Sequence, residues 1–416
     1  MASVSFQGRH KRTATDFTRK RSLTMPRVIA VIARGVMKSI QREVDEVLST
    51  LFGQSVPDRG VTDGAFCRAR MKMKHTAFIE LSHEAVDMAY RTMENLEYTA
   101  GYRILAIDGS KVNLPETPEI RAHFGPAEKS DGRQGAPQAL LSQCYDIQNG
   151  LIIDATLSPG DSCERRAAMN HLSRIGEDDI VLFDRGYPAH WFLQGVDATG
   201  ARFLARAPVD FSAAVRRFVE SGKATDLIAL EPTDSSRSAC REFGLCEAPL
   251  TVRAVRIELC TGEVEVLLTN FIDEPFTQEL FGALYTMRWP VEEGYKHLKV
   301  PLELENFSGR SVESVCQDVH ARVFLANMTA VTVLPTREQV AQQTRDRKLE
   351  YDLNWTSAVS KVRQAGVLLF LGQDLEAVVH MVQEAASKCL SPVRPGRSNP
   401  RKKRSAKRFA TNRKHI

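Results

Sequence analysis

The chain has 416 residues, of which 43% are hydrophobic and 26% are charged, so its composition is that of a globular protein with room for two or three domains. No stretch approaches the roughly 18 consecutive apolar residues that a membrane span needs, and the N-terminus has no apolar signal segment, so we expect a cytoplasmic protein. The eight cysteines lie singly and without zinc-site spacing, which indicates reduced thiols and no structural zinc.

The net charge of +5 hides an uneven distribution along the chain. Residues 1–42 contain ten Lys or Arg and one acid, Asp16, and residues 391–416 contain ten Lys or Arg and no acid. The two ends together carry +19, so residues 43–390 carry −14. Basic ends on an acidic body suggest a polyanionic partner such as nucleic acid, although basic tails also serve solubility or non-specific RNA binding.

Residues 1–98 have helical periodicity and predict a helical DNA-binding domain. A first long helix begins near Pro26, and a second follows a cap at Thr62 and Asp63. Basic side chains lie in the first turns of the second helix, and a basic helix in a small helical module is typical of DNA binding. The candidate DNA contacts are Arg68, Arg70, Lys72 and Lys74.

From residue 99 to 204 the pattern changes to short apolar strands. The first strand, in "YRILAIDGS", is predicted to end at Asp108-Gly109, and two more strands are joined by the hairpin signal Asn149-Gly150. A helix follows, and then a strand in "DIVLFDRGY" that ends at Asp184. If the first and fourth strands are neighbours, Asp108 and Asp184 emerge side by side. This order of elements belongs to the ribonuclease-H-like fold.

The rest of the chain divides into four further regions. Residues 205–272 predict a β-rich insertion with a hairpin turning at Thr261-Gly262, and residues 273–335 predict the second part of the core, including a strongly amphipathic helix. Residues 336–390 predict a helical C-terminal region, and residues 391–416 a basic, disordered tail. The predicted fold class is therefore α/β: a ribonuclease-H-like core interrupted by a β-rich insertion, with helical N- and C-terminal regions.

The segment "YTMRWPVEEGYKHLKV", residues 285–300, brings Tyr285, Arg288, Glu292 and Lys299 close together in sequence. Pro290 disfavours helical backbone at the residue before it, so we expect a break there. A new helix beginning at Pro290 carries Glu292 in its first turns and Lys299 two turns later on the same face. The alternative is an ordinary surface helix with a solvated face.

Three acids, Asp108, Asp184 and Glu292, suit the chemistry of phosphoryl transfer. Carboxylates are the ligands that Mg²⁺ or Mn²⁺ prefers, and two such ions activate a nucleophile and stabilise the leaving 3′-oxygen of DNA. Each acid alone has a structural interpretation, as a turn residue, a partner of Arg185 and a first-turn helix acid, respectively. Their joint presence at strand ends and on a nearby helix favours a catalytic site.

These motifs resemble those of the bacterial insertion-sequence transposases of the DDE class, in the hairpin-forming insertion-sequence-four family. The spacing Tyr-x2-Arg-x3-Glu-x6-Lys of that family fits Tyr285, Arg288, Glu292 and Lys299. "AIDGS" and "DRGY" look like its first and second aspartate motifs, and residues 302–328 are similar to the segment after its glutamate. The resemblance spans about residues 10–415, with the N-terminal region and the insertion matching in pattern only.

The resemblance implies a site and its ligands. Asp108, Asp184 and Glu292 would bind two Mg²⁺ or Mn²⁺ ions, and Tyr285, Arg288 and Lys299 would hold phosphates near the cleaved end. A further implied contact is Trp289, which would stack on a base flipped from that end, although its ring equally suits hydrophobic anchoring of the helix.

The implied function is cut-and-paste DNA transposition through a hairpin intermediate. The implied partners are double-stranded DNA, namely the terminal inverted repeats and the target, and a second copy of the chain in a dimer or higher oligomer on DNA. No nucleotide-binding G-x4-G-K-[ST] loop occurs, in keeping with a reaction that conserves phosphodiester bonds. Two alternatives remain: a catalytically silent, transposase-derived DNA-binding protein, and a ribonuclease-H-like DNA nuclease such as a junction resolvase.

Overall fold

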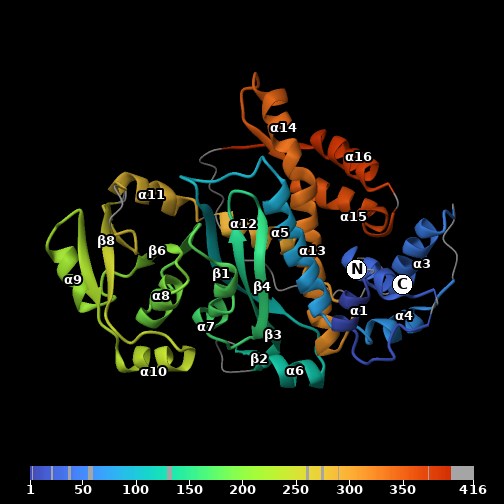
Figure 1. Ribbon diagram of the computed structural model, residues 1–416, viewed down its shortest axis with the longest axis horizontal. Coiled ribbons are helices and arrows are strands. Elements are labelled where there is room, and N and C mark those ends of the chain that lie inside the picture. Colours follow the sequence, from blue (N-terminus) through green and yellow to red (C-terminus); the bar gives the residue numbers. More distant parts are fainter. Residues whose placement is uncertain are drawn as a thin grey trace.

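The structure is a computed structural model, shown in Figure 1, that describes residues 1–394 except for a few short gaps. The gaps are residues 2, 20–21, 36–38, 55–59, 129–133, 259–261, 273–275, 289 and 373. The predicted basic tail at 391–416 therefore lies almost wholly outside the described residues, as do Trp289 and the turn residue Thr261. Among the described helices, none is both long and apolar enough to cross a membrane.

A nine-stranded mixed sheet forms the centre of the molecule. Its strands run in the order β2-β3-β1-β5-β6-β9-β8-β7, and β4 pairs with β3. Their bounds are β1 (Arg103–Asn113), β2 (Pro126–Glu128), β3 (Gln134–Asp146), β4 (Leu151–Pro159), β5 (Asp179–Phe183), β6 (Arg202–Ala207), β7 (Thr225–Leu230), β8 (Leu250–Glu258) and β9 (Val264–Thr269). The short strands β10 (Tyr351–Leu353) and β11 (Leu390–Pro392) pair separately.

The side chains of the central strands alternate between two hydrophobic cores, because successive residues of a strand point to opposite faces of the sheet. In β1, Ile104 and Ala106 belong to one core, and Leu105 and Ile107 belong to the other. Helices cover both faces, and so the strands are apolar on both sides.

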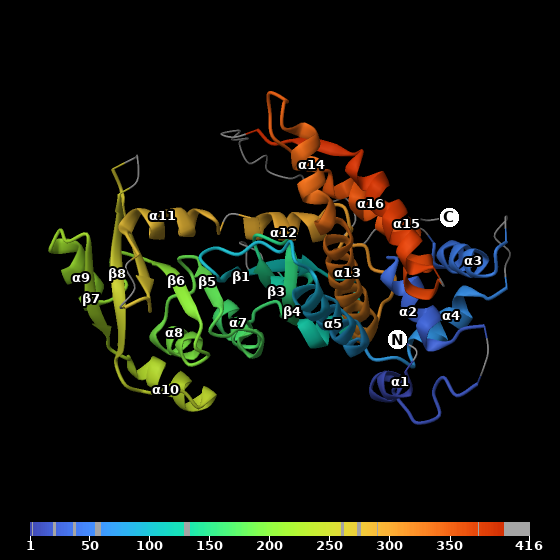
Figure 2. The same cartoon turned by 45° about the horizontal axis from the view of Figure 1, so that its top comes forward.

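The first face of the sheet is covered by α11 (Gln278–Thr286), α12 (Pro290–Lys299) and α13 (Val312–Val333), whose apolar residues enter the core that contains Ile104. The second face is covered by α7 (Glu164–Met169), α8 (His190–Asp197), α9 (Ala213–Glu220) and α10 (Asp234–Phe243). Figure 2 shows α11 and α12 following one another along one side of the sheet, with α7, α8 and α10 on the opposite side.

The N-terminal helices pack against α13 and the C-terminal helices, on the side of the molecule away from β8 (Figure 1). They are α1 (Val4–His10), α2 (Met25–Ala33), α3 (Ile40–Leu51), α4 (Asp63–Arg70) and α5 (Thr76–Thr92). The remaining helical elements are α6 (Pro118–Phe124), η1 (Leu172–Arg174), η2 (Leu334–Thr336), α14 (Arg337–Thr344), α15 (Trp355–Leu371) and α16 (Leu375–Ser387).

Most of the predicted elements are confirmed. The N-terminal region is helical, β1 and β5 are parallel neighbours, β8 and β9 form the second hairpin, and α11 and α12 are separated at Pro290. The two long helices expected in residues 1–98 are wrong in extent. The first is divided into α2 and α3, with Gly35 in a left-handed conformation after α2, and the second into α4 and α5, because the main chain of Lys72 and Lys74 bonds the N-terminal segment instead. The 205–272 strands continue the central sheet, since β9 pairs with β6. Helix α10, capped by the Thr233 hydroxyl, lies within the region predicted to be β-rich.

Helix α13 differs from the expected amphipathic helix because it is buried on all sides. It lies between the sheet and the N-terminal helices, so its polar residues are buried as well as its apolar ones. Arg322, for example, is buried and donates to the main-chain carbonyls of Leu302 and Asp318. These internal hydrogen bonds offset the cost of burying a guanidinium.

Candidate active site

Asp108 and Asp184 lie at the same level of two neighbouring parallel strands. The last register pair that joins β1 to β5 is Ala106 with Leu182, and each aspartate follows its member of that pair by two residues. The charge of Asp184 raises the pKa of Asp108, in keeping with neighbouring carboxyl groups. The predicted convergence of the two acids is therefore present in the structure.

The expected end of the first strand at Asp108-Gly109 is wrong. β1 continues to Asn113, because β3 goes on pairing with it from Gly109 with Ser142 to Asn113 with Gln138. β5, in contrast, ends at Phe183. Asp108 thus lies in the middle of β1, at the point where its pairing with β5 stops and the two strands separate.

Each aspartate is oriented by a nearby main-chain amide. Asp108 Oδ1 accepts from the Gly109 amide at 2.8 Å, and Asp184 Oδ1 accepts from the Gly186 amide at 2.8 Å. Burial, together with the charges of Asp184 and Glu164, raises the pKa of Asp108 to about 6, and the Gly109 amide and Arg288 limit this shift. The Asp108 carboxylate lies where a cation would strongly stabilise it.

Helix α12, which carries Glu292, is bonded directly to β1. The Tyr295 hydroxyl donates to the Asp108 carbonyl oxygen at 2.6 Å and lies 3.0 Å from the Leu141 carbonyl oxygen. Lys299 Nζ donates to Ser110 Oγ at 2.7 Å and to the Lys111 carbonyl at 2.8 Å. Glu292 lies one turn before Tyr295 on the same side of the helix, so these bonds place it beside the strand of Asp108.

Tyr285 and Arg288 lie at the corner between α11 and α12, close to the aspartates. The Arg288 guanidinium is 6.0 Å from the centre of the Tyr285 ring, and its charge lowers the pKa of Asp108. The Tyr285 hydroxyl and Arg288 Nε are buried, and burial raises the pKa of Tyr285 while the charge of Arg288 opposes the rise. Polar groups of this kind suit a ligand that brings acceptors to the corner.

Three residues near the site were not predicted from sequence. Glu164, the exposed first residue of α7, has carboxyl atoms 3.0–3.1 Å from the position that a Cβ at Gly109 would take. Tyr295 bonds α12 to β1, and Gln143 lies opposite Asp108 on β3. A polar residue inside the apolar run "ALLSQCYD" was the one available signal for Gln143.

The basic residues predicted in the N-terminal module fall into two groups. Arg68, Lys72 and Lys74 are exposed. Arg70 corrects the expectation, because its guanidinium is 2% exposed and pairs with Asp318 at 3.1 Å. Its other donors bond Gln317 and Ser308, so none of them is available to DNA.

The chemistry of the acidic side chains fits divalent ions, since carboxylate oxygens are the ligands that Mg²⁺ and Mn²⁺ prefer. In the described part of the chain, no three His, Cys, Asp or Glu side chains are gathered closely enough to hold an ion in their present positions. Asp108, Asp184 and Glu292 would therefore have to draw together around the ions.

Known bacterial proteins are similar in sequence to parts of this chain. The chain is similar to the transposase InsG for insertion sequence element IS4 of Escherichia coli, with 25% identity over 240 residues that cover 56% of this chain and 53% of InsG. It is similar to the putative transposase InsZ of the same organism, with 31% identity over 86 residues that cover 20% of this chain and 29% of InsZ. The chain thus spans about half the length of the first of these relatives and less of the second.

A solved structure described as the piggyBac transposase synaptic complex with hairpin DNA aligns with a TM-score of 0.43 and 10% identity, covering 92% of this chain and 81% of that one. A family model described as "Transposase DDE domain" matches residues 99–328, which is more than half of the chain. The matched segment contains Asp108, Asp184 and Glu292, and the chain belongs to the DDE transposase family.

Proposed function

We propose that the chain is a DNA transposase that excises an insertion sequence and joins it to a new DNA site, in the bacterial cytoplasm. The observation that carries this proposal is the placement of Asp108 and Asp184 at one level of adjacent strands, with the helix of Glu292 bonded to the Asp108 main chain. Such a grouping of carboxylates at the edge of a sheet suits phosphoryl transfer on DNA.

We assign the catalytic core a ribonuclease-H-like fold in two parts, residues 99–204 and 273–335, separated by the β-rich insertion at 205–272. The mixed sheet, the parallel β1–β5 pair and the acids on it support this assignment. The remaining domains of the proposal are the DNA-binding module at 1–98, the helical region at 336–390 and the basic tail at 391–416.

Asp108, Asp184 and Glu292 are the proposed ligands of two Mg²⁺ or Mn²⁺ ions, which would supply an activated nucleophile and stabilise the leaving 3′-oxygen. Arg288 and Tyr285 present buried donors at the neighbouring corner and would bind a DNA phosphate there. Lys299 would exchange its bond to Ser110 for a phosphate oxygen when DNA arrives. We retain Trp289, which lies outside the described residues, as the proposed stacking partner of a flipped base.

The proposed reaction has four stages, each a substitution at phosphorus. Water attacks the phosphodiester at the transposon end and releases a 3′-hydroxyl. That hydroxyl attacks the opposite strand, which forms a hairpin and frees the flanking DNA. Water then opens the hairpin, and the 3′-hydroxyl attacks the target phosphodiester. The last step exchanges one phosphodiester bond for another and needs no nucleotide cofactor.

The N-terminal module offers a basic surface for double-stranded DNA. The Arg12 amide donates to the Lys72 carbonyl at 2.9 Å and the Lys74 amide to the His10 carbonyl at 2.8 Å, so the basic N-terminal segment lies against the turn between α4 and α5. The basic side chains of the N-terminal segment and of the α4–α5 turn therefore lie on one surface. We propose that Arg68, Lys72 and Lys74 contact DNA phosphates.

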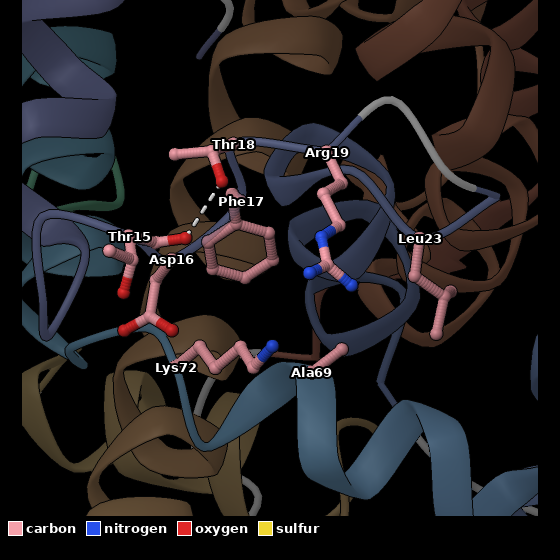
Figure 3. Close-up of a pocket in the computed structure, with 8 residues that line it drawn as sticks. All are labelled: Thr15, Asp16, Phe17, Thr18, Arg19, Leu23, Ala69 and Lys72. Carbon is pink, nitrogen blue, oxygen red and sulfur yellow. Dashed lines mark hydrogen bonds between the residues drawn. The ribbon is translucent and has the colours of Figure 1, made fainter.

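A pocket next to this turn supports the proposal. Figure 3 shows Arg19, Lys72 and the Phe17 ring facing the same opening. Phe17 adopts a left-handed backbone with φ of 56°, which is unusual for a bulky residue and occurs most often at functional sites. The lining residues are Thr15, Asp16, Phe17, Thr18, Arg19, Leu23, Ala69 and Lys72. Cations around an aromatic ring suit a nucleotide of the bound DNA.

We propose that the protein acts as a dimer or higher oligomer on DNA, since two transposon ends must be joined together. The helices of residues 336–390 are the candidate contact, because α16 exposes the apolar side chains Leu375 and Met381 at 53% and 57%. Exposed apolar side chains on one helix suit a protein interface.

Cleavage of the DNA that flanks the gene tests the function. The full-length protein is mixed with a duplex carrying the flanking sequence and with a shuffled duplex, in Mg²⁺ or in EDTA. A transposase cuts the flanking duplex in Mg²⁺ alone and forms a hairpin product on it. Binding without cleavage in Mg²⁺ would identify a silent DNA-binding protein, and equal cleavage of both duplexes would identify a nuclease.

A further inference from the structure

The side-chain amide of Gln143 is buried and forms no hydrogen bond with the part of the chain that the structure describes. The residue is 0% exposed, and neither Nε2 nor Oε1 has a partner among the described residues. Native proteins satisfy the great majority of buried polar side-chain atoms. An amide with both ends unpaired is therefore unusual, and its position in the fold indicates what it is for.

The amide lies between the strand of Asp108 and the helix of Glu292. Gln143 is the register partner of Asp108 across the β1–β3 pair, and directly opposed residues of antiparallel strands point to the same face. On that face α12 passes over it: a Cβ at Gly294 would be 3.0 Å from Gln143 Nε2. Gly294, two residues after Glu292, has no side chain and therefore allows α12 to pack closely against the Gln143 amide.

The chemistry of the neighbouring groups is complementary. An amide offers two N–H donors, and an ionised carboxylate is an acceptor on both oxygens. Asp108 Oδ1 accepts from the Gly109 amide, which leaves Oδ2 as the oxygen to be oriented. The neighbouring β3 residues on the same face as Gln143 are Leu141 and Tyr145, so β3 brings no second carboxylate to this point.

We propose that Gln143 is a positioning residue of the acidic site, whose N–H donates to the Asp108 carboxylate when divalent ions draw the acidic side chains together. This inference rests on the proposed function, since it concerns the same ions. Gln143 holds the Asp108 oxygens in the orientation that binds a cation and does not itself touch DNA. Replacing a residue that hydrogen-bonds a metal ligand commonly weakens metal affinity by about 10–100-fold.

Replacement by methionine separates this role from simple packing. Gln143→Met keeps the length and approximate volume of the side chain and removes the unpaired amide. The control is Thr156→Val, which removes the buried and unpartnered Thr156 hydroxyl on β4, opposite Ser142 and therefore on the other face of the sheet. Both substitutions delete an unsatisfied polar group, but only the first lies next to Asp108.

The experiment uses the full chain without DNA. Mn²⁺ binding is measured by isothermal titration calorimetry, and unfolding of the metal-free protein by thermal scans. We expect Gln143→Met to bind Mn²⁺ about tenfold or more weakly while its unfolding midpoint rises by about 2 °C. Thr156→Val should keep the affinity of the wild type.

Each other result is decisive. If Gln143→Met binds Mn²⁺ as the wild type does, the positioning role is wrong and the metal site stands. A lower unfolding midpoint for Gln143→Met, or an equal loss of affinity in Thr156→Val, makes the residue structural and overturns the proposal. If the wild type itself binds no Mn²⁺, the proposed metal-dependent function fails along with this inference.

Discussion

The hydroxyl of Tyr295 donates to the main-chain carbonyl of Asp108 at 2.6 Å. This bond joins α12 to β1, which are far apart in sequence, at the proposed metal ligand Asp108. Glu292 precedes Tyr295 by one helical turn. The position of the third acid relative to the first therefore depends on this bond and on the bonds of Lys299 to β1.

Tyr295→Phe should loosen α12 while keeping its packing. The change removes one buried hydrogen bond, so we expect the free energy of unfolding to fall by about 1 kcal/mol. DNA cleavage should fall by about tenfold or more, because small displacements of a catalytic group are costly. Hydrogen exchange of residues 290–299 should rise in the same variant, and unchanged exchange together with unchanged cleavage would remove Tyr295 from the account.

Arg70 and Lys72 lie two residues apart in sequence but in opposite environments. Arg70→Ala should lower the free energy of unfolding by about 3–5 kcal/mol, because Asp318 would be left as a buried, unpaired charge. Chemical denaturation measures this loss. If Arg70→Ala is as stable as the wild type, the buried pair is not formed in solution.

Lys72→Ala is the matched surface substitution. The exposed side chain contributes little to folding, so stability should change by less than about 0.5 kcal/mol. Binding to a DNA duplex should weaken, with the slope of log affinity against log salt reduced by about 1 for one lost phosphate contact. Fluorescence anisotropy over a salt series measures both quantities, and an unchanged salt slope would place DNA elsewhere.

Asp154 should make the protein sensitive to acid. Burial alone would raise its pKa, but hydrogen bonds with His171 at 2.7 Å and His83 at 3.0 Å outweigh burial and hold that pKa well below its usual range. A carboxyl with a lowered folded-state pKa stabilises the fold above its unfolded pKa of about 3.9, and this contribution is lost as the pH falls below that value.

The measurement is the free energy of unfolding between pH 6 and pH 2. Asp154 should contribute a slope of up to about 1.4 kcal/mol per pH unit at the acid end. Asp154→Asn, which cannot titrate, should show a shallower decline than the wild type. Parallel curves for the two proteins would show that the His171–Asp154–His83 contacts carry no such linkage.

The sequence predicted the parts of the site that depend on local signals. Apolar runs that end near an acid placed Asp108 and Asp184 on neighbouring strands, and Pro290 predicted the break between α11 and α12 because proline constrains the residue before it. The 1–98 helices followed from periodicity and caps such as the Thr62 hydroxyl on the Ala65 amide. Each of these features is determined by residues that are close together in the sequence, so the sequence alone predicts it.

What the sequence could not predict depends on distant partners. A basic helix has the same pattern whether its Arg side chains face DNA or the protein interior, and Asp318, the partner of Arg70, is 248 positions away. The continuation of β1 past Asp108 depends on β3, and the burial of α13 on all sides depends on helices from both ends of the chain. The placement of Gln143 and Tyr295 next to Asp108 follows from strand pairing and helix packing, which the sequence pattern does not show.

Metal-dependent transposition requires that Asp108 and Asp184 bind a divalent ion during DNA cleavage, and a change of ligand atom examines this requirement. Cysteine places a soft thiolate where Mg²⁺ requires a hard oxygen, whereas Mn²⁺ accepts sulfur more readily. Asp184→Cys and Asp108→Cys should lose cleavage of the flanking duplex in Mg²⁺ and regain part of it in Mn²⁺, while Thr156→Val cleaves in both. Cysteine variants that cut equally well in either metal, or wild-type cleavage that persists in EDTA, would contradict the account.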